Sequence, residues 1–159
     1  MANNQNHSVF IIKAKENFDA AELCAKKKHY NAWANRAWYS IFQIISCHIF
    51  NNLQLQRGKK KFKNGNTINY CYFNFHGHHV EAKFGSAING YFLAHRDVAE
   101  ALSTLHPELC IRMFYRHRNI SDYSRTQSID SKSYNSYNSN FKLAYKYLKK
   151  NLESDNDKN

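Results

Sequence analysis

The chain has 159 residues, 43% of them hydrophobic and 15% aromatic, so it is long enough for one domain with a real core and is not disordered. With only 5 glycines and 1 proline, and no stretch that approaches about 18 apolar residues, it is expected to form neither a β-sandwich, nor a β-barrel, nor a membrane span. The 23 Lys and Arg against 12 Asp and Glu give a formal net charge of +11, which favours a polyanionic partner over solubility alone.

The N-terminal half predicts two helices. Ser8 is a candidate N-cap for a helix over about residues 9–28, whose apolar stripe is loose and whose last turn is rich in lysine. A second helix is expected over about residues 30–53, because apolar residues from Trp33 onward recur at three- and four-residue steps. The polar N-terminus lacks the layout of a secretory signal, so we expect a cytoplasmic protein.

Residues 54–77 break the helical pattern. A basic run comes first and consists of Arg57, Lys59, Lys60, Lys61 and Lys63. Aromatic residues follow, and their alternation predicts a short β-hairpin arm or an ordered loop at about residues 66–76. This order suits nucleic acid, because cations hold phosphates and rings stack on bases. The equally weighted alternative is that the rings pack on the core while the lysines stay solvated.

The C-terminal half predicts further helices. They are expected over about residues 79–93, 97–105, 107–123 and 140–153. Pro107 suits the first position of the helix that it opens. Residues 124–140 are rich in Ser, Asn and Tyr and are expected to form a long polar loop. Residues 154–159 are expected to form a disordered tail.

Histidines and cysteines are the residue types that would first suggest a metal site. His76, His78 and His79 have no companion Cys or carboxylate at ligand spacing, so a capping role for His78 or His79 is favoured over a metal site. The four cysteines lie far apart and are expected to be buried thiols. The glycines form no phosphate-cradling fingerprint, so a nucleotide cofactor is not expected, and the ligand spacing leads us to expect no metal either.

Residues 116–123 are the most informative segment, with three cations, an amide, an acid and a phenol near the end of an apolar-periodic helix. At about 100° per residue, Arg118 and Asp122 are neighbours and are expected to form an (i, i+4) ion pair. Another side of this helix carries Arg112, Arg116, Asn119 and Tyr123. His117 lies among the apolar residues, where a buried histidine bonded to a backbone carbonyl is at least as good an interpretation as a catalytic one.

Two segments resemble a known family. Residues 35–42 read NRAWYSIF and residues 118–123 read RNISDY, and in this order they resemble two helix motifs of the HEPN superfamily, more narrowly of its small UPF0332-type members. The resemblance covers about residues 18–153. It implies an all-α, up-and-down bundle of four to five helices, a single domain over residues 1–153, and a homodimer.

The resemblance also implies an activity. Many HEPN proteins are metal-independent endoribonucleases with an Arg-X4-6-His motif, in which His moves a proton and Arg stabilises charge on the phosphate. Here the register set by Asn119 puts Tyr123 at the expected His position, and the shifted match is Arg112-X4-His117. Because five residues turn a helix by about 140°, that pair needs a kink or a second protomer to converge.

Three hypotheses follow. The first is an RNA-cleaving toxin or defence effector. The second is a non-catalytic module that binds RNA or a partner subunit, such as a nucleotidyltransferase-type antitoxin for which Tyr123 would be a modification target. The third is a structural partner of an acidic protein. The candidate catalytic residues are Arg118, His117, Arg112, Asp122 and Tyr123. The candidate RNA-binding residues are Arg116, Asn119, Arg57, Lys59, Lys60, Lys61 and Lys63.

Overall fold

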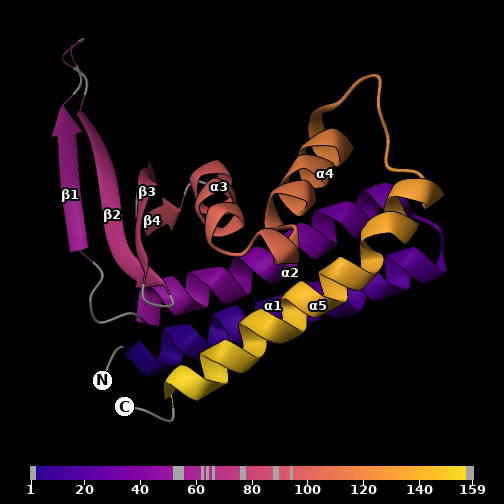
Figure 1. Ribbon diagram of the computed structural model, residues 1–159, viewed down its shortest axis with the longest axis horizontal. Helices are drawn as coiled ribbons and strands as arrows, with labels where there is room; N and C mark the ends of the chain where they lie inside the picture. Colours follow the sequence, from indigo (N-terminus) through magenta and orange to yellow (C-terminus); the bar gives the residue numbers. More distant parts are fainter. Residues whose placement is uncertain are drawn as a thin grey trace.

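The computed structural model describes residues 3–51, 56–61, 63, 65, 67–75, 78–87, 90–93 and 95–156. Within these ranges the elements are, in chain order, α1 (Asn3–Lys26), α2 (Tyr30–Asn51), β1 (Gln56–Lys61), β2 (Thr67–Phe75), β3 (His78–Ala87), β4 (Gly90–Leu93), α3 (His95–Leu105), the 3₁₀ turn η1 (Pro107–Leu109), α4 (Ile111–Tyr123) and α5 (Ser131–Asn156). The helices form a bundle, and a small sheet is inserted between α2 and α3 (Figure 1). None of the helices in the described ranges combines the length and the apolar character that a bilayer span needs.

Helix α2 is the centre of the bundle, because its apolar residues face several neighbours at once. Its fully buried large side chains are Trp33, Trp38, Ile41, Ile44 and Ile45. The ring of Trp33 meets Tyr134 and Phe141 of α5 edge-on, with centroids 5.0 and 6.2 Å away. Near the other end, Nε2 of His48 lies 3.0 Å from the carbonyl oxygen of Leu148. The first half of α2 contacts the first half of α5, and the end of α2 contacts a later part of α5. The two helices therefore run in the same direction.

Helix α1 runs antiparallel to α2 and packs on α5 through Phe18, whose ring stacks on Phe141 at 5.2 Å. It begins earlier than the predicted residue 9 and ends at a tight turn before α2. In this turn Lys28 has a φ of 59°, and the N–H of His29 donates to the carbonyl of Cys24 over 2.9 Å. Helices usually place glycine at such a left-handed position, because a residue with a Cβ atom disfavours a positive φ. Lys28 adopts this conformation nonetheless.

Helix α4 packs on α2 in the opposite direction. The ring of Tyr115 lies 5.3 Å from that of Trp38, and further along α4 the side chain of Asp122 meets Asn35 of α2. The helix predicted over residues 107–123 is interrupted, which corrects that expectation. Pro107 begins a 3₁₀ turn, and Cys110, with a φ of 56°, separates this turn from α4.

The long polar loop predicted over residues 124–140 is mostly wrong. Helix α5 begins at Ser131, and the carboxylate of Asp130 caps it by accepting the N–H of Ser133 over 2.8 Å. The same helix carries its inward stripe at three- and four-residue steps, namely Tyr134, Tyr137, Phe141, Ala144 and Leu148. At the other end α5 continues through Asn156, so residues 154–156 are helical and not a disordered tail. Residues 157–159 lie outside the described ranges.

The four strands form an antiparallel sheet in the order β1-β2-β3-β4. The helix predicted over residues 79–93 is therefore wrong, because β3 pairs with β2 from Tyr70↔Lys83 to Phe75↔His78 and then with β4. Residues 78 and 79 are strand residues rather than helix caps, and residue 76 lies outside the described ranges. The β-hairpin arm predicted at 66–76 corresponds to β2, which forms one hairpin with β1 and another with β3.

The predicted all-α bundle of four to five helices is confirmed by α1 to α5, and the sheet is an addition to it. Among the residues whose burial is described, the core is made mainly by helical side chains, and it includes Phe114 of α4, Phe141 of α5 and Leu102 of α3. The packing of α4 against α2 and α3 brings together the polar groups described next (Figure 1).

Candidate functional site

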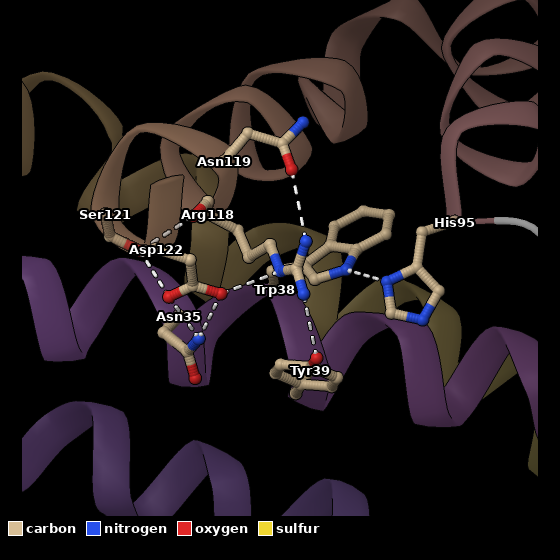
Figure 2. Close-up of polar contacts among 8 residues, drawn as sticks. All are labelled: Asn35, Trp38, Tyr39, His95, Arg118, Asn119, Ser121 and Asp122. Carbon is tan, nitrogen blue, oxygen red and sulfur yellow. Dashed lines mark hydrogen bonds and ion pairs between the residues drawn. The ribbon is translucent and has the colours of Figure 1, made fainter. Parts of the chain in front are cut away.

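Arg118 is the centre of a polar cluster between α4 and α2 (Figure 2). Its Nε lies 3.0 Å from Oδ2 of Asp122, an electrostatic contact in which the N–H is not aligned with the oxygen. Nη1 donates to Oδ1 of Asn119 over 3.1 Å, and Nη2 donates to the hydroxyl oxygen of Tyr39 over 3.1 Å. The predicted (i, i+4) pair of Arg118 and Asp122 is therefore confirmed, and Asn119 is part of the same cluster.

Asp122 is held in turn by α2. The side-chain amide of Asn35 donates to both carboxylate oxygens, over 2.8 and 2.9 Å, and the hydroxyl of Ser121 lies 3.2 Å from Oδ1 (Figure 2). The side chain of Arg118 is 13% exposed and that of Asp122 is 25% exposed. A pair this far out of water is fixed by its neighbours, so Asn35 and Tyr39 of α2 set the position of the guanidinium.

The surroundings of Arg118 keep it charged. Burial by itself lowers the pKa of Arg118, but hydrogen bonding and charge interaction with Tyr39 and Tyr123 outweigh burial and raise the pKa above its usual value. The guanidinium carbon lies 5.7 Å from the ring centroid of Tyr39 and 4.9 Å from that of Tyr123. The cluster therefore offers a permanent positive charge between two aromatic rings.

His95, the first residue of α3, lies beside this cluster. The indole Nε1 of Trp38 donates to Nδ1 of His95 over 3.0 Å (Figure 2), and the ring of Phe42 lies 3.9 Å away between centroids. The ring of Tyr39 meets the imidazole ring of His95 edge-on, with centroids 5.7 Å apart. Burial, and then the charge of Arg118, lower the pKa of His95 to about 4. Its imidazole is therefore neutral near pH 7.

His117 lies on a different side of α4 from Arg118. Its side chain is buried with 5% of its surface exposed, and its ring meets Tyr137 of α5 edge-on at 5.0 Å. Nδ1 is buried and has no hydrogen-bond partner in the described part of the chain. Burial, and then the charge of Arg116, lower the pKa of His117. The expected histidine of the Arg112-X4-His117 pair thus points into the bundle.

The outer face of α4 carries the remaining predicted residues of this segment. Arg112 and Arg116 are exposed, and Tyr123 exposes 68% of its side chain at the end of the helix. Neither guanidinium has an ion-pair or hydrogen-bond partner within the described ranges, although the backbone N–H of Arg112 donates to the hydroxyl of Ser103. These two arginines are the free cations nearest in sequence to Arg118.

The basic run predicted to bind RNA lies elsewhere. Arg57, Lys59 and Lys60 are in β1, the first strand of the sheet, and Lys61 and Lys63 at its end are exposed. Strand β1 lies at the opposite side of the molecule from the C-terminal end of α4 (Figure 1). The structure therefore does not bring this run together with Arg118.

No three His, Cys, Asp or Glu side chains in the described ranges come together as metal ligands. Comparisons with protein-family models, characterised proteins and solved structures gave no match for this chain. Any inference about function therefore rests on the residues of this chain and on the geometry of the site.

His95 could not be found from the sequence, and Asn35 and Tyr39 stood out only as parts of a motif. The contacts of Trp38 with His95 and of Tyr39 with Arg118 join residues 57 and 79 positions apart. Spacing along one helix cannot indicate such contacts. The one available signal was that Tyr39 and Arg118 belong to the two segments that carry the family resemblance.

Proposed function

We propose that this protein is a HEPN-type, RNA-directed protein that binds RNA at the C-terminal end of α4. The observation that carries the proposal is the fixed guanidinium of Arg118, which Asp122, Asn119 and Tyr39 hold in place. Each terminal nitrogen of an arginine has two N–H groups, and the bonds to Asn119 and Tyr39 use one on each. Of the two remaining terminal N–H groups, one can serve the hydrogen bond to Tyr123, which leaves at least one for a phosphate oxygen, with little side-chain freedom left to lose on binding.

The surroundings of Arg118 support a nucleic acid as the ligand. Arg112 and Arg116 add exposed positive charge on the same helix, within a chain whose formal net charge is +11. The exposed ring of Tyr123 lies next to the guanidinium, where it can stack on an unpaired base. Cations for phosphates beside a ring for bases favour a single-stranded RNA over an acidic protein.

The test is the binding of a fluorescein-labelled polyuridine RNA, measured by anisotropy over a range of salt concentrations. Replacing both Arg112 and Arg116 with Ala is expected to weaken binding about tenfold and to make the salt dependence shallower by about one unit of slope for each phosphate no longer neutralised. The matched control replaces Lys13 of α1 and Lys150 of α5, two exposed lysines away from the C-terminal end of α4, and removes the same charge. The proposal fails if the parent protein does not bind, or if the control weakens binding as much.

RNA cleavage by a toxin or defence effector is the second candidate. The immobilised charge of Arg118 favours it, because a fixed cation stabilises the charge that develops on phosphate during transfer. His117, the expected proton-transfer group, is buried against Tyr137, so the geometry favours binding over cleavage. Incubating RNA with the purified protein decides the matter. Intact RNA removes the enzyme hypothesis, and unchanged cleavage by His117→Ala removes His117 from the mechanism.

The partners belong to the same proposal. Light scattering tests the homodimer that the family resemblance implies. For a nucleotidyltransferase-type antitoxin, the exposed phenol of Tyr123 is the group open to modification. Intact-mass measurement after incubation with a minimal nucleotidyltransferase and ATP is expected to show an added nucleotide on the parent protein and none on Tyr123→Phe. A mass gain on both proteins would place the modification elsewhere.

A further inference from the structure

The tautomer of His95 follows from its hydrogen bond to Trp38. An indole N–H can only donate, so Nδ1 of His95 must be the acceptor over the 3.0 Å between them. In the neutral ring the single proton is therefore on Nε2. No group in the described part of the chain takes a hydrogen bond from Nε2. The Nε2–H of His95 is thus an unused donor, and the lone pair of Nδ1 is already taken by the hydrogen bond from Trp38.

Tyr39 is in a similar state. Arginine has no acceptor, so the hydroxyl oxygen of Tyr39 accepts from Nη2 of Arg118 over 3.1 Å. The hydroxyl hydrogen is then free to donate to another group, and no described residue takes it. The rings of Tyr39 and His95 are in edge-on contact at 5.7 Å. The two unused donors therefore belong to residues whose rings are in contact, and one of these residues is hydrogen-bonded to Arg118.

We infer that His95 is a binding residue of the proposed RNA site, where its Nε2–H and the hydroxyl of Tyr39 donate to oxygens of the phosphate group that Arg118 attracts. This inference rests on the proposed function and gives His95 a role other than proton transfer. The ring of Phe42, 3.9 Å away between centroids, and the bond from Trp38 fix the imidazole in place. A donor that is already oriented loses little freedom when the ligand arrives.

The charge state of the site agrees with this role. Burial and the nearby charge of Arg118 lower the pKa of His95 to about 4, so the ring donates as a neutral group across the physiological range. Among the described side chains, the titratable and charged groups that face it are Tyr39 from α2 and Arg118 from α4. A phosphate between these groups would offset the repulsion between Arg118 and a protonated ring.

The two amide variants of His95 separate its two ring nitrogens. In His95→Asn the side-chain oxygen takes the place of Nδ1 and still accepts from Trp38, but the donor at Nε2 is lost. In His95→Gln the longer side chain returns an N–H near the position of Nε2. With the polyuridine RNA, His95→Asn is expected to bind about tenfold more weakly, which corresponds to one hydrogen bond to a charged group. His95→Gln is expected to stay within about threefold of the parent protein.

A second measurement does not depend on a variant. Nitrogen-15 NMR of the imidazole at pH 6 is expected to show the neutral Nε2–H tautomer, with its Nε2 resonance shifting when polyuridine RNA is added. A protonated ring, the other tautomer, or equal RNA affinity for His95→Asn and the parent protein would overturn the inference and leave the proposed function standing. Absence of RNA binding by the parent protein would instead overturn the proposed function, and the inference with it.

Discussion

The two sides of α4 place adjacent residues in opposite environments. On the side that faces α2, Arg118 is charged and is surrounded by Asp122, Asn119 and Tyr39. On the side that faces α5, His117 is buried against Tyr137, and its Nδ1 has no partner within the described ranges. A step of one residue turns the helix by about 100°, which is enough to separate the ion-paired Arg118 from His117, whose ring makes packing contacts. A segment that reads as one cluster in sequence is thus two sites in space.

The largest expected effect comes from breaking the charged side. Asp122→Ala leaves the guanidinium of Arg118 largely out of water without its counter-charge, and we expect a loss of about 2–3 kcal/mol in the free energy of unfolding. The value lies just below the roughly 3–5 kcal/mol typical of breaking a buried pair, because the two side chains keep 13% and 25% exposure. Urea unfolding monitored by circular dichroism measures it.

The control for this prediction has the same spacing on an exposed surface. Arg96 and Glu100 form an (i, i+4) pair on α3 at 3.0 Å, with side chains 72% and 46% exposed. Glu100→Ala is expected to change the free energy of unfolding by less than about 0.5 kcal/mol. Equal effects of Asp122→Ala and Glu100→Ala would mean that the α2-facing side of α4 is no more constrained than an ordinary surface.

A smaller effect of the opposite sign is expected on the side facing α5. His117→Phe keeps an aromatic ring, slightly larger than imidazole, removes the unpartnered Nδ1 and retains the contact with Tyr137, so it is expected to stabilise the protein by about 1 kcal/mol. RNA affinity is expected to stay the same. A strongly destabilised variant would show that a polar partner of His117 exists. Weaker RNA binding would mean that His117 is part of the RNA-binding site.

A dependence of stability on pH is expected as well, and both histidines contribute to it with the same sign. The pKa of His95 is about 4 in the folded chain against an ordinary value of 6.5, so between these pH values the unfolded chain binds more protons. Stability contributed by the neutral ring is therefore complete above about pH 6.5 and is lost as the pH falls towards 4. Burial lowers the pKa of His117 as well, which acts in the same direction. Urea unfolding at pH 7 and pH 5 is expected to show a smaller loss for His95→Asn than for the parent protein, and identical losses would mean that His95 titrates normally.

Local periodicity predicted those features that depend on one helix. The spacing of Arg118 and Asp122 was enough for their ion pair, and the helical wheel put Arg112 and Arg116 on one side of the helix, where the structure has both exposed. The contact of His95 with Trp38 was beyond such reasoning, because it depends on how α3 returns to the bundle after the sheet.

The errors in secondary structure have identifiable causes. In residues 79–93, apolar residues recur at helical steps, but the preceding strand β2 offers a hydrogen-bonding partner that periodicity alone does not reveal. In residues 131–140, the many Ser and Asn residues suggested a loop. Tyr134 and Tyr137 nevertheless continue the stripe of Phe141, and burial of that stripe outweighs the weak helix propensity of the polar residues.

The parallel course of α2 and α5 has a practical consequence for handling the protein. Because α1 runs against both of them, α1 begins and α5 ends at the same end of the bundle, while the C-terminal end of α4 lies at the other (Figure 1). An affinity tag, a fluorophore or a surface tether attached at either terminus is therefore held about the length of a helix away from Arg118. Immobilised or labelled protein keeps its arginine-rich end open to solution, so both termini are usable attachment points for measurements with polyanions.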